Sequence, residues 1–397
     1  MSTTQQTMKT MSWVVVPSKF CNLRCAYCYE WKELDSRARM SPELLRRVFE
    51  GIRDYHQQME RRFGKTRTVI SWLGGEPFTL PMTYLESLMA LQREVLGDEL
   101  MDSGAIHNVV QTNLYRLTDP MIDFILRHRW EVGVSLDVAE GIRVTVNGKA
   151  TEQAVLANVE RLRARGIEPG AIMVLAKHTA SSICRIHDFF VENGFKFLRV
   201  LPLFSGPAER PSERFQASSA ELVDAMCRLF VHWFERGQPI QVEPFPEYMG
   251  NALRRMARLG YRLLDRREDG ESVLIVNTNG DVYQLLDAYE PERAMGNIGT
   301  QDISTILASE RSHLALRRDD ELKARTCNTC EYAGHCNGWP IFESPRETTS
   351  QGRCPIAYPV QRFIERYFQD AGLGAQELAA MLTAMIPEQP DAQMSAA

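Results

Sequence analysis

The sequence lacks an apolar run long enough to cross a membrane, a signal peptide and any long basic cluster. No stretch approaches the roughly 18–20 apolar residues that a membrane helix requires. The N-terminal segment MSTTQQTMKT has neither the apolar region nor the cleavage site of a secretory signal, so we expect a cytoplasmic protein. The formal net charge is −5, and the basic residues form no run that would match a nucleic acid. We therefore expect neither a membrane nor a nucleic acid as a partner.

The chain does contain nine cysteines. Because the cytosol keeps thiols reduced, clustered cysteines there indicate a metal site or catalysis rather than a disulfide framework. Seven of them fall into two groups, whereas Cys184 and Cys227 stand alone in helix-like apolar patterns. We expect those two to be packed core residues.

Strand-like and helix-like segments alternate over the first two-thirds of the chain. In the first helix-like segment Ser41 is the predicted N-cap, Pro42 suits the first turn, and apolar residues recur at helical spacing. Six such units predict an α/β fold, a partial (β/α)6 TIM-like barrel with its chemistry at the C-terminal ends of parallel strands. The predicted strands cover residues 12–18, 68–75, 106–113, 131–138, 171–178 and 195–204.

The pattern changes after about residue 240. Asn279-Gly280 between two β-like runs predicts a hairpin. A loop-rich stretch with the remaining cysteines comes next. The last predicted element is an amphipathic helix with Val360, Ile364 and Phe368 on its apolar face. The expected organisation is a disordered N-terminus (1–11), a partial barrel (12–240), a helical connector (241–270), a cysteine-rich domain (271–373), and a C-terminal helix and tail (374–397).

The first cysteine group, Cys21-x3-Cys25-x2-Cys28, directly follows the first predicted strand. Three thiolates from one loop can ligate three irons of a [4Fe–4S] cluster and leave the fourth iron open to a small molecule. Zinc is the alternative, but it requires a fourth ligand, and His56 lies too far along the next helix to provide one. We therefore expect a [4Fe–4S] cluster with an open iron.

This pattern resembles the radical S-adenosylmethionine (SAM) superfamily, in which C-x3-C-x-aromatic-C follows the first strand. GGE (74–76), QTN (111–113) and SLD (135–137) match at the ends of the next three strands, and Arg143 follows. The resemblance implies that the GGE backbone meets the amino group of SAM, that the SLD residues and Arg143 hold its ribose and carboxylate, and that Tyr27 contacts its adenine. The implied SAM-binding set is Tyr27, Gly74, Gly75, Glu76, Asn113, Ser135, Asp137 and Arg143.

The second cysteine group consists of Cys327, Cys330, Cys336 and Cys354. Four such residues suit structural zinc or an iron–sulfur cluster, and their spacing does not decide between the two. The region from Gly280 onward resembles the SPASM extension of radical SAM enzymes that mature peptides and proteins. The fuller SPASM pattern has further cysteines that hold a second auxiliary cluster. The resemblance therefore implies one auxiliary [4Fe–4S] cluster on these four cysteines, with zinc as the alternative.

The departures from the fuller pattern affect the catalytic base. Leu285 and Pro340 stand where that pattern has cysteines, and a cysteine upstream of the hairpin is also missing. In protein-oxidising relatives an Asp directly follows the cysteine that Leu285 replaces here. This chain has Leu286 at that position and Asp287 one residue later. Asp287 is the candidate catalytic residue, and a surface carboxylate is the alternative.

The resemblance implies a radical SAM oxidoreductase. A reduced cluster passes one electron to SAM, and the resulting 5′-deoxyadenosyl radical abstracts hydrogen from the substrate. We expect a peptide or protein substrate, such as a short precursor peptide, that undergoes crosslinking, epimerisation or oxidation in ribosomal peptide maturation. The implied reductant is a protein such as flavodoxin or ferredoxin. The alternatives are a small-molecule radical SAM dehydrogenase or epimerase in a cofactor or natural-product pathway, and a non-catalytic iron–sulfur or zinc protein.

A peptide substrate predicts an exposed strand edge near the radical site. An extended chain gains affinity when its backbone pairs with such an edge. The outermost predicted strand (195–204) and the hairpin (271–288) are the two expected edges.

Overall fold

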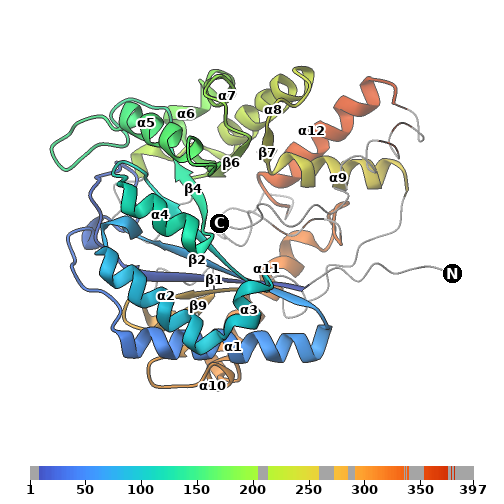
Figure 1. Cartoon of the computed structure of the whole chain (residues 1–397). Coiled ribbons are helices and arrows are strands. Elements are labelled where there is room, and N and C mark those ends of the chain that lie inside the picture. The colour runs from blue at the N-terminus through green and yellow to red at the C-terminus, as the bar shows by residue number, and fades with distance from the viewer. Residues whose placement is uncertain are drawn as a thin grey trace.

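The computed structural model describes residues 9–203, 213–258, 272–284, 291–334, 336, 338, 353–373, 377 and 380. Within these ranges one ten-stranded sheet has the order β10-β9-β8-β1-β2-β3-β4-β5-β6-β7. Its parallel strands β1 to β7 follow the chain order, and helices lie along the outside of the curved sheet (Figure 1). These strands are β1 Lys9–Ser18, β2 Thr66–Gly74, β3 Ile106–Thr112, β4 Glu131–Ser135, β5 Gly170–Leu175, β6 Phe197–Pro202 and β7 Gln241–Glu243.

The helices between the strands follow the predicted pattern. In α1 the Ser41 hydroxyl accepts from the Leu44 N–H at 3.2 Å, Pro42 is the first helical residue, and Val48 and Ile52 are buried. The N-cap, the first-turn proline and the apolar face predicted for this helix are thus confirmed. The helices of this part are α1 Pro42–Phe63, α2 Met82–Leu96, α3 Asp98–Asp102, α4 Asp119–His128, α5 Glu152–Arg163, α6 Lys177–Ala180, α7 Ile183–Glu192 and α8 Ser219–Glu235.

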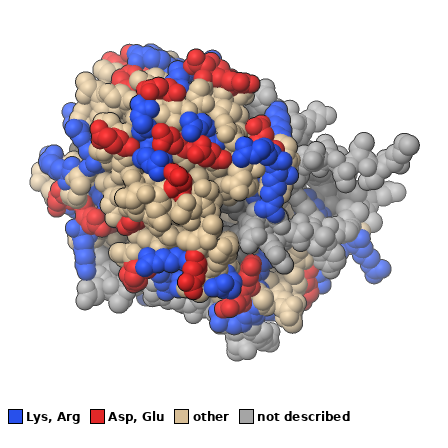
Figure 2. Space-filling model, turned by 90° about the horizontal axis from the view of Figure 1, so that it is seen from below, with Lys and Arg blue, Asp and Glu red and all other residues tan. Residues whose placement is uncertain are grey.

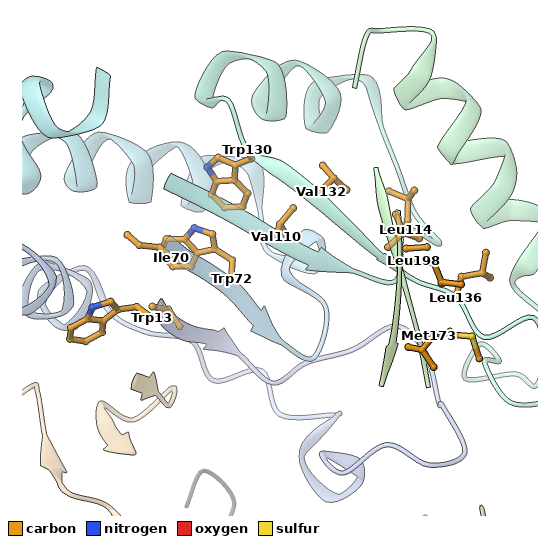
Figure 3. Packing of buried hydrophobic residues seen from close by; sticks show 14 of the residues in the cluster. Trp13, Ile70, Trp72, Val110, Leu114, Trp130, Val132, Leu136, Met173 and Leu198 are labelled. Atoms are coloured by element: carbon orange, nitrogen blue, oxygen red, sulfur yellow. The ribbon is translucent and has the colours of Figure 1, made fainter. Parts of the chain in front are cut away.

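The core fills the space between the sheet and these helices (Figure 3). The Trp72 indole of β2 stacks on Trp130 at 5.7 Å, and Phe49 of α1 meets it edge-on at 6.2 Å. Its Nε1–H donates to the Asn108 carboxamide at 2.9 Å, so its one polar atom is paired inside the core.

The C-terminal part joins the same sheet instead of forming a separate layer. After α9 (Phe245–Met256), β8 (Ser272–Val276) pairs in parallel with β1, with Met11 opposite Ser272 and Val15 opposite Val276. The predicted hairpin is present, because β9 (Asp281–Gln284) pairs antiparallel with β8. Gly280 in its turn has φ +89°, which favours glycine. The remaining elements are β10 Gly296–Asn297, α10 Ile303–Leu307, α11 Glu310–Cys327 and α12 Ala357–Asp370.

Four expectations need correction. Strand β1 begins at Lys9, so residues 9–11 belong to the sheet and not to the N-terminal segment. Residues 241–243 of the expected helical connector form β7, which pairs with Phe197–Arg199 of β6. The strand predicted as outermost (195–204) is therefore an internal strand of the sheet over Phe197–Arg199. Part of the region expected to be loop-rich forms α11, a helix of 18 residues.

Residues 1–8 and 381–397, at the expected N-terminal segment and tail, lie outside the described residues. Figure 2 shows basic and acidic side chains interspersed over one face of the molecule. Within the described ranges, no helix combines the length and apolar character that a membrane crossing demands.

Candidate functional site

The first cysteine group lies in a loop between β1 and α1 that backbone hydrogen bonds hold in place. The Arg24 N–H donates to the Val144 carbonyl at 2.7 Å, and the Ala26 N–H donates to the Ile142 carbonyl at 2.9 Å. These contacts join the loop to the segment after β4. Cys21 is buried and Cys25 and Cys28 are half-buried, and all three are free thiols.

Two glycines let the end of β2 lie directly against this loop. Gly74 has φ +125°, and a Cβ on Gly75 would lie 2.3 Å from both the Lys19 and the Phe20 carbonyl oxygens. The Glu76 N–H donates to the Phe20 carbonyl at 2.9 Å. Only glycine permits so close an approach of two backbones. The GGE segment is therefore a structural requirement for placing the cysteine loop at the strand ends.

The Glu76 carboxylate joins the ends of β2 and β3. It is 3% exposed and accepts from the Thr112 hydroxyl at 2.7 Å, the Asn113 N–H at 2.7 Å and the Phe78 N–H at 3.1 Å. Burial raises the pKa of this carboxyl, and these donors oppose the rise. Thr112 was not among the predicted site residues, because a threonine at a strand end gives no signal in the sequence.

Asn113 and Ser135 extend the site along the next two strand ends. The Asn113 Nδ2 donates to the Asn22 carboxamide at 2.8 Å and lies 3.8 Å from the Cys21 sulfur. The Ser135 hydroxyl accepts from the Gln111 side chain at 2.7 Å. Both predicted residues thus lie on the same edge of the sheet as the cysteines.

Asp137, Arg143 and Tyr27 form a buried charged network beside the cysteines. Asp137 is 1% exposed and accepts from the Arg143 Nε at 2.7 Å, from the Val174 N–H at 2.7 Å and from the Tyr27 hydroxyl. The Arg143 Nη1 donates to the Cys25 sulfur at 3.4 Å. Burial alone would lower the pKa of Arg143, but Tyr27, Cys25 and Asp137 hold it well above its usual value. Asp137 therefore orients Arg143, and the guanidinium reaches toward the cysteine group.

His178 is a site residue that the sequence analysis missed. It lies in α6, three residues after the end of β5, and its ring stacks on the Tyr27 ring at 6.2 Å with 19° between the planes. Both of its ring nitrogens are buried and have no hydrogen-bond partner among the described residues. Burial lowers the pKa of this histidine, which favours its neutral form. A lone histidine in the segment AKHTA gives no sign of this position.

The three thiols suit an iron–sulfur cluster by their chemistry. Burial raises the pKa of Cys21 to about 11 and that of Cys28 to about 12, and it also raises the pKa of Cys25. The charge of Cys25 acts on Cys21, and the charges of Cys25 and Cys21 both act on Cys28, so the three thiols are linked electrostatically. Soft metal ions stabilise thiolates that burial would otherwise disfavour. A cluster held by three thiolates fits this donor set.

The second cysteine group surrounds a cavity of about 40 Å³. Cys327 is the last residue of α11, and Cys354 lies three residues before the first residue of α12. All four thiols of the group line the cavity, and burial raises their pKa values, that of Cys327 to about 11. One water molecule needs about 10–15 Å³ on this scale, so the cavity has room for a larger group. Four thiolates around it fit a fully ligated cluster.

Several residues of the sequence analysis are not part of the described site. Asp287, the candidate catalytic residue, falls outside the described residues, as do Leu285, Leu286 and Pro340. Cys184 in α7 and Cys227 in α8 are partly buried and pack against the main core. His56 is buried in α1, and its Nδ1 lies 2.9 Å from the Thr68 hydroxyl. This contact is with β2 and not with the cysteine group.

Comparison with known proteins bears on this site. Residues 15–190 match the Radical SAM superfamily, and residues 268–331 match SPASM, an iron–sulfur cluster-binding domain. The serine-type anaerobic sulfatase-maturating enzyme of Bacteroides thetaiotaomicron is 25% identical over 378 residues, which cover 88% of this chain and 86% of that enzyme. A cysteine-type anaerobic sulfatase-maturating enzyme of Clostridium perfringens is 24% identical over 349 residues, with 83% and 89% covered.

Solved structures share the fold. Native anSMEcpe with bound AdoMet superposes with a TM-score of 0.68 at 19% identity, over 94% of this chain and 100% of that chain. Streptococcus suis SuiB bound to precursor peptide SuiA gives a TM-score of 0.57 at 16% identity, over 86% and 74%. At these identities the likeness shows that the chain shares the fold of these two structures.

The fold and the two cysteine groups define the class of protein, a radical SAM enzyme. The chain carries a Radical SAM domain over residues 15–190 and a SPASM domain over residues 268–331, as the motifs predicted. Its cofactors are accordingly a [4Fe–4S] cluster with SAM and an auxiliary iron–sulfur centre.

Proposed function

We propose that this enzyme reductively cleaves SAM and abstracts hydrogen from a peptide or protein substrate. The observation that carries the proposal is that the three thiols of the first cysteine group lie beside the Glu76 and Asp137 networks at the C-terminal ends of the parallel strands. The peptide part of the proposal draws on the relatives named as sulfatase-maturating enzymes and on the peptide-bound neighbours.

The proposed roles of the residues follow from their contacts. Cys21, Cys25 and Cys28 hold the SAM-binding cluster, which when bound supplies the electron that cleaves SAM to the 5′-deoxyadenosyl radical. Arg143, fixed by Asp137, presents a cation at the side of Cys25, where the carboxylate of SAM is attracted to it. Gly74 and Gly75 keep the backbone of β2 close enough to the cysteine loop for both to meet one ligand.

Ser135, Asn113 and Tyr27 complete the proposed SAM site. The Ser135 hydroxyl, held by Gln111, is placed to meet the ribose, and Asn113 braces the loop at Cys21. The Tyr27 hydroxyl is engaged by Asp137, so its aromatic ring and backbone are what remain for the adenine. The neutral His178 ring next to it adds a donor and an acceptor without adding a charge.

The four cysteines of the second group are the proposed ligands of a single auxiliary [4Fe–4S] cluster. They surround one cavity, and three of them lie on or beside α11 and the turn that follows it. A fully ligated cluster cannot bind substrate directly, so its proposed role is electron transfer.

Access for a peptide depends on the sheet edge next to the site. Strand β7 pairs with β6 only as far as Arg199, and Val200–Pro202 of β6 extend beyond that pairing within the described ranges. This short edge lies toward the C-terminal ends of the strands, where the cysteines are. We propose that an extended substrate lies across it. A one-electron donor such as flavodoxin or ferredoxin is the proposed reductant.

The test is an anaerobic assay with reconstituted enzyme, dithionite and SAM. The candidate substrates are peptides from short reading frames beside the gene and sulfatase-derived peptides with serine or cysteine at the target position. We expect one peptide to accelerate 5′-deoxyadenosine release and to change in the mass spectrum. Loss of two hydrogen atoms indicates oxidation or crosslinking, and deuterium uptake from heavy water indicates epimerisation.

The matched control is the Cys21→Ala, Cys25→Ala, Cys28→Ala variant with the same peptides. The peptide proposal is wrong if no peptide changes or stimulates cleavage while a small metabolite does both. That outcome would favour the small-molecule alternative and leave the radical SAM assignment intact.

A further inference from the structure

Helix α12 begins directly beside the auxiliary cavity and directs a side-chain amide at one of its sulfurs. Gln361, one turn into the helix, is 1% exposed and lines the cavity. Its Nε2 lies 3.7 Å from the Cys336 sulfur, within hydrogen-bonding range for sulfur. The Gly338 N–H donates to the same sulfur at 3.4 Å.

The orientation of this amide is fixed by its other contacts. The Gln361 Nε2 also donates to the Ala357 backbone carbonyl at 3.3 Å, and that oxygen can only accept. The Asn251 Nδ2 of α9 donates to the Gln361 Oε1 at 3.0 Å. A flipped amide would place its oxygen against the carbonyl and the sulfur, so the N–H must face Cys336. Asn251 is itself 1% exposed, which keeps the pair rigid.

The start of α12 adds further donors at a second cysteine of the group. The backbone N–H groups of Ile356, Ala357 and Tyr358 face the Cys354 sulfur. These are N-terminal amides of a helix, where the partial charge is positive. The helix thus directs backbone amides at one cysteine of the group and a side-chain amide at another.

We propose that Gln361 sets the reduction potential of the auxiliary cluster. Reduction adds a negative charge that spreads onto the cysteine sulfurs, and an N–H donor stabilises the reduced state more than the oxidised state. The donor therefore raises the potential. This inference rests on the proposed ligand set, and Gln361 acts through Cys336 as a tuning residue. A tuned potential is useful only to a cluster that changes its redox state, so the arrangement favours electron transfer over a purely structural role.

The experiment is a redox titration of the intact holoenzyme, followed by EPR with SAM present. SAM changes the signal of the cluster to which it binds, so the signal that does not respond to SAM belongs to the auxiliary cluster. In Gln361→Leu we expect the equilibrium constant for one-electron reduction of that cluster to fall about tenfold, a shift of about 59 mV to lower potential. Gln369→Leu is the control, because Gln369 is an exposed amide of the same helix that contacts Glu365 and, within the described part of the chain, no sulfur.

A second variant guards against loss of the fold. Gln361→Asn keeps a polar side chain but withdraws the donor from Cys336, and it should shift the potential in the same direction with iron content unchanged. Proton ENDOR of the reduced auxiliary cluster should also lose one exchangeable coupling in either variant. Unchanged potentials in both variants, with full iron and an intact auxiliary signal, would overturn the inference. Absence of a second cluster from the wild type would instead overturn the ligand set on which it rests.

Discussion

Replacing Asp137 tests how the site holds its positive charge. Asp137 is 1% exposed and the Arg143 side chain is 15% exposed, and their contact is 2.7 Å. Removing one partner of a buried ion pair leaves the other charge uncompensated, which typically costs about 3–5 kcal/mol. Because Arg143 keeps some contact with solvent, we expect the lower end, about 3 kcal/mol, for Asp137→Asn.

The assay has a stability arm and a binding arm. Urea unfolding of the cluster-free chain, followed by circular dichroism without oxygen, gives the change in unfolding free energy. In a double-mutant cycle with Arg143→Met, the interaction energy between the two residues should account for most of that loss in unfolding free energy. In the reconstituted enzyme SAM should bind at least about tenfold more weakly, which corresponds to about 1.4 kcal/mol.

The control is another aspartate–arginine pair beside the same loop. Arg24 pairs with Asp35, whose side chain is 87% exposed. Exposed pairs contribute about 0–1 kcal/mol, so Asp35→Asn should change stability and SAM affinity little. A coupling energy below about 0.5 kcal/mol for Asp137 and Arg143 would refute the view that they form one charged unit.

Three further predictions concern the cysteines and their support. Gly75→Ala should displace the cysteine loop and lower the iron content, because the new Cβ would lie 2.3 Å from two backbone oxygens. In the control, Gly250→Ala, the new Cβ would meet only the flexible Arg254 side chain, so this variant should keep all its iron. Cys184→Ala and Cys227→Ala should each leave the iron content unchanged and lower the unfolding free energy by roughly 1 kcal/mol. Loss of half the iron in either variant would show that the replaced cysteine is a cluster ligand. Since burial raises the pKa of Cys21 from 9.0 to about 11, the cluster-free chain should be most stable below pH 9 and lose stability toward pH 11. Urea midpoints on both sides of pH 9 check this, and the triple alanine variant of the first cysteine group should show a smaller loss.

The periodic parts of the fold could be predicted from local patterns. The six expected strands and α1 follow from apolar runs and capping residues that act within about one turn or one strand. The strand β7 could not be predicted in this way, because Gln241–Glu243 has only three residues and lies between Pro239 and Pro244. Its pairing partner β6 lies about forty residues earlier. The parallel pairing of β8 with β1 joins segments still farther apart, and no local pattern records it.

The site shows the same division. The cysteines could be predicted because metal ligation requires particular residue types at particular spacings. The roles of Gly75 and Asp137 could be predicted only as motif members, since the backbone contact with Phe20 and the hydrogen bond from Val174 depend on how the strands meet. His178 and Gln361 belong to no motif, and their importance comes from what surrounds them in the fold.

The central claim is reductive SAM cleavage at the cluster of Cys21, Cys25 and Cys28. The most direct measurement is the yield of 5′-deoxyadenosine from SAM under dithionite, together with iron per chain, for the wild type and the triple alanine variant. We expect about eight irons and steady product formation for the wild type, against about four irons and no product for the variant. Product formation by the variant, or none by a wild type that holds its full iron, would contradict it.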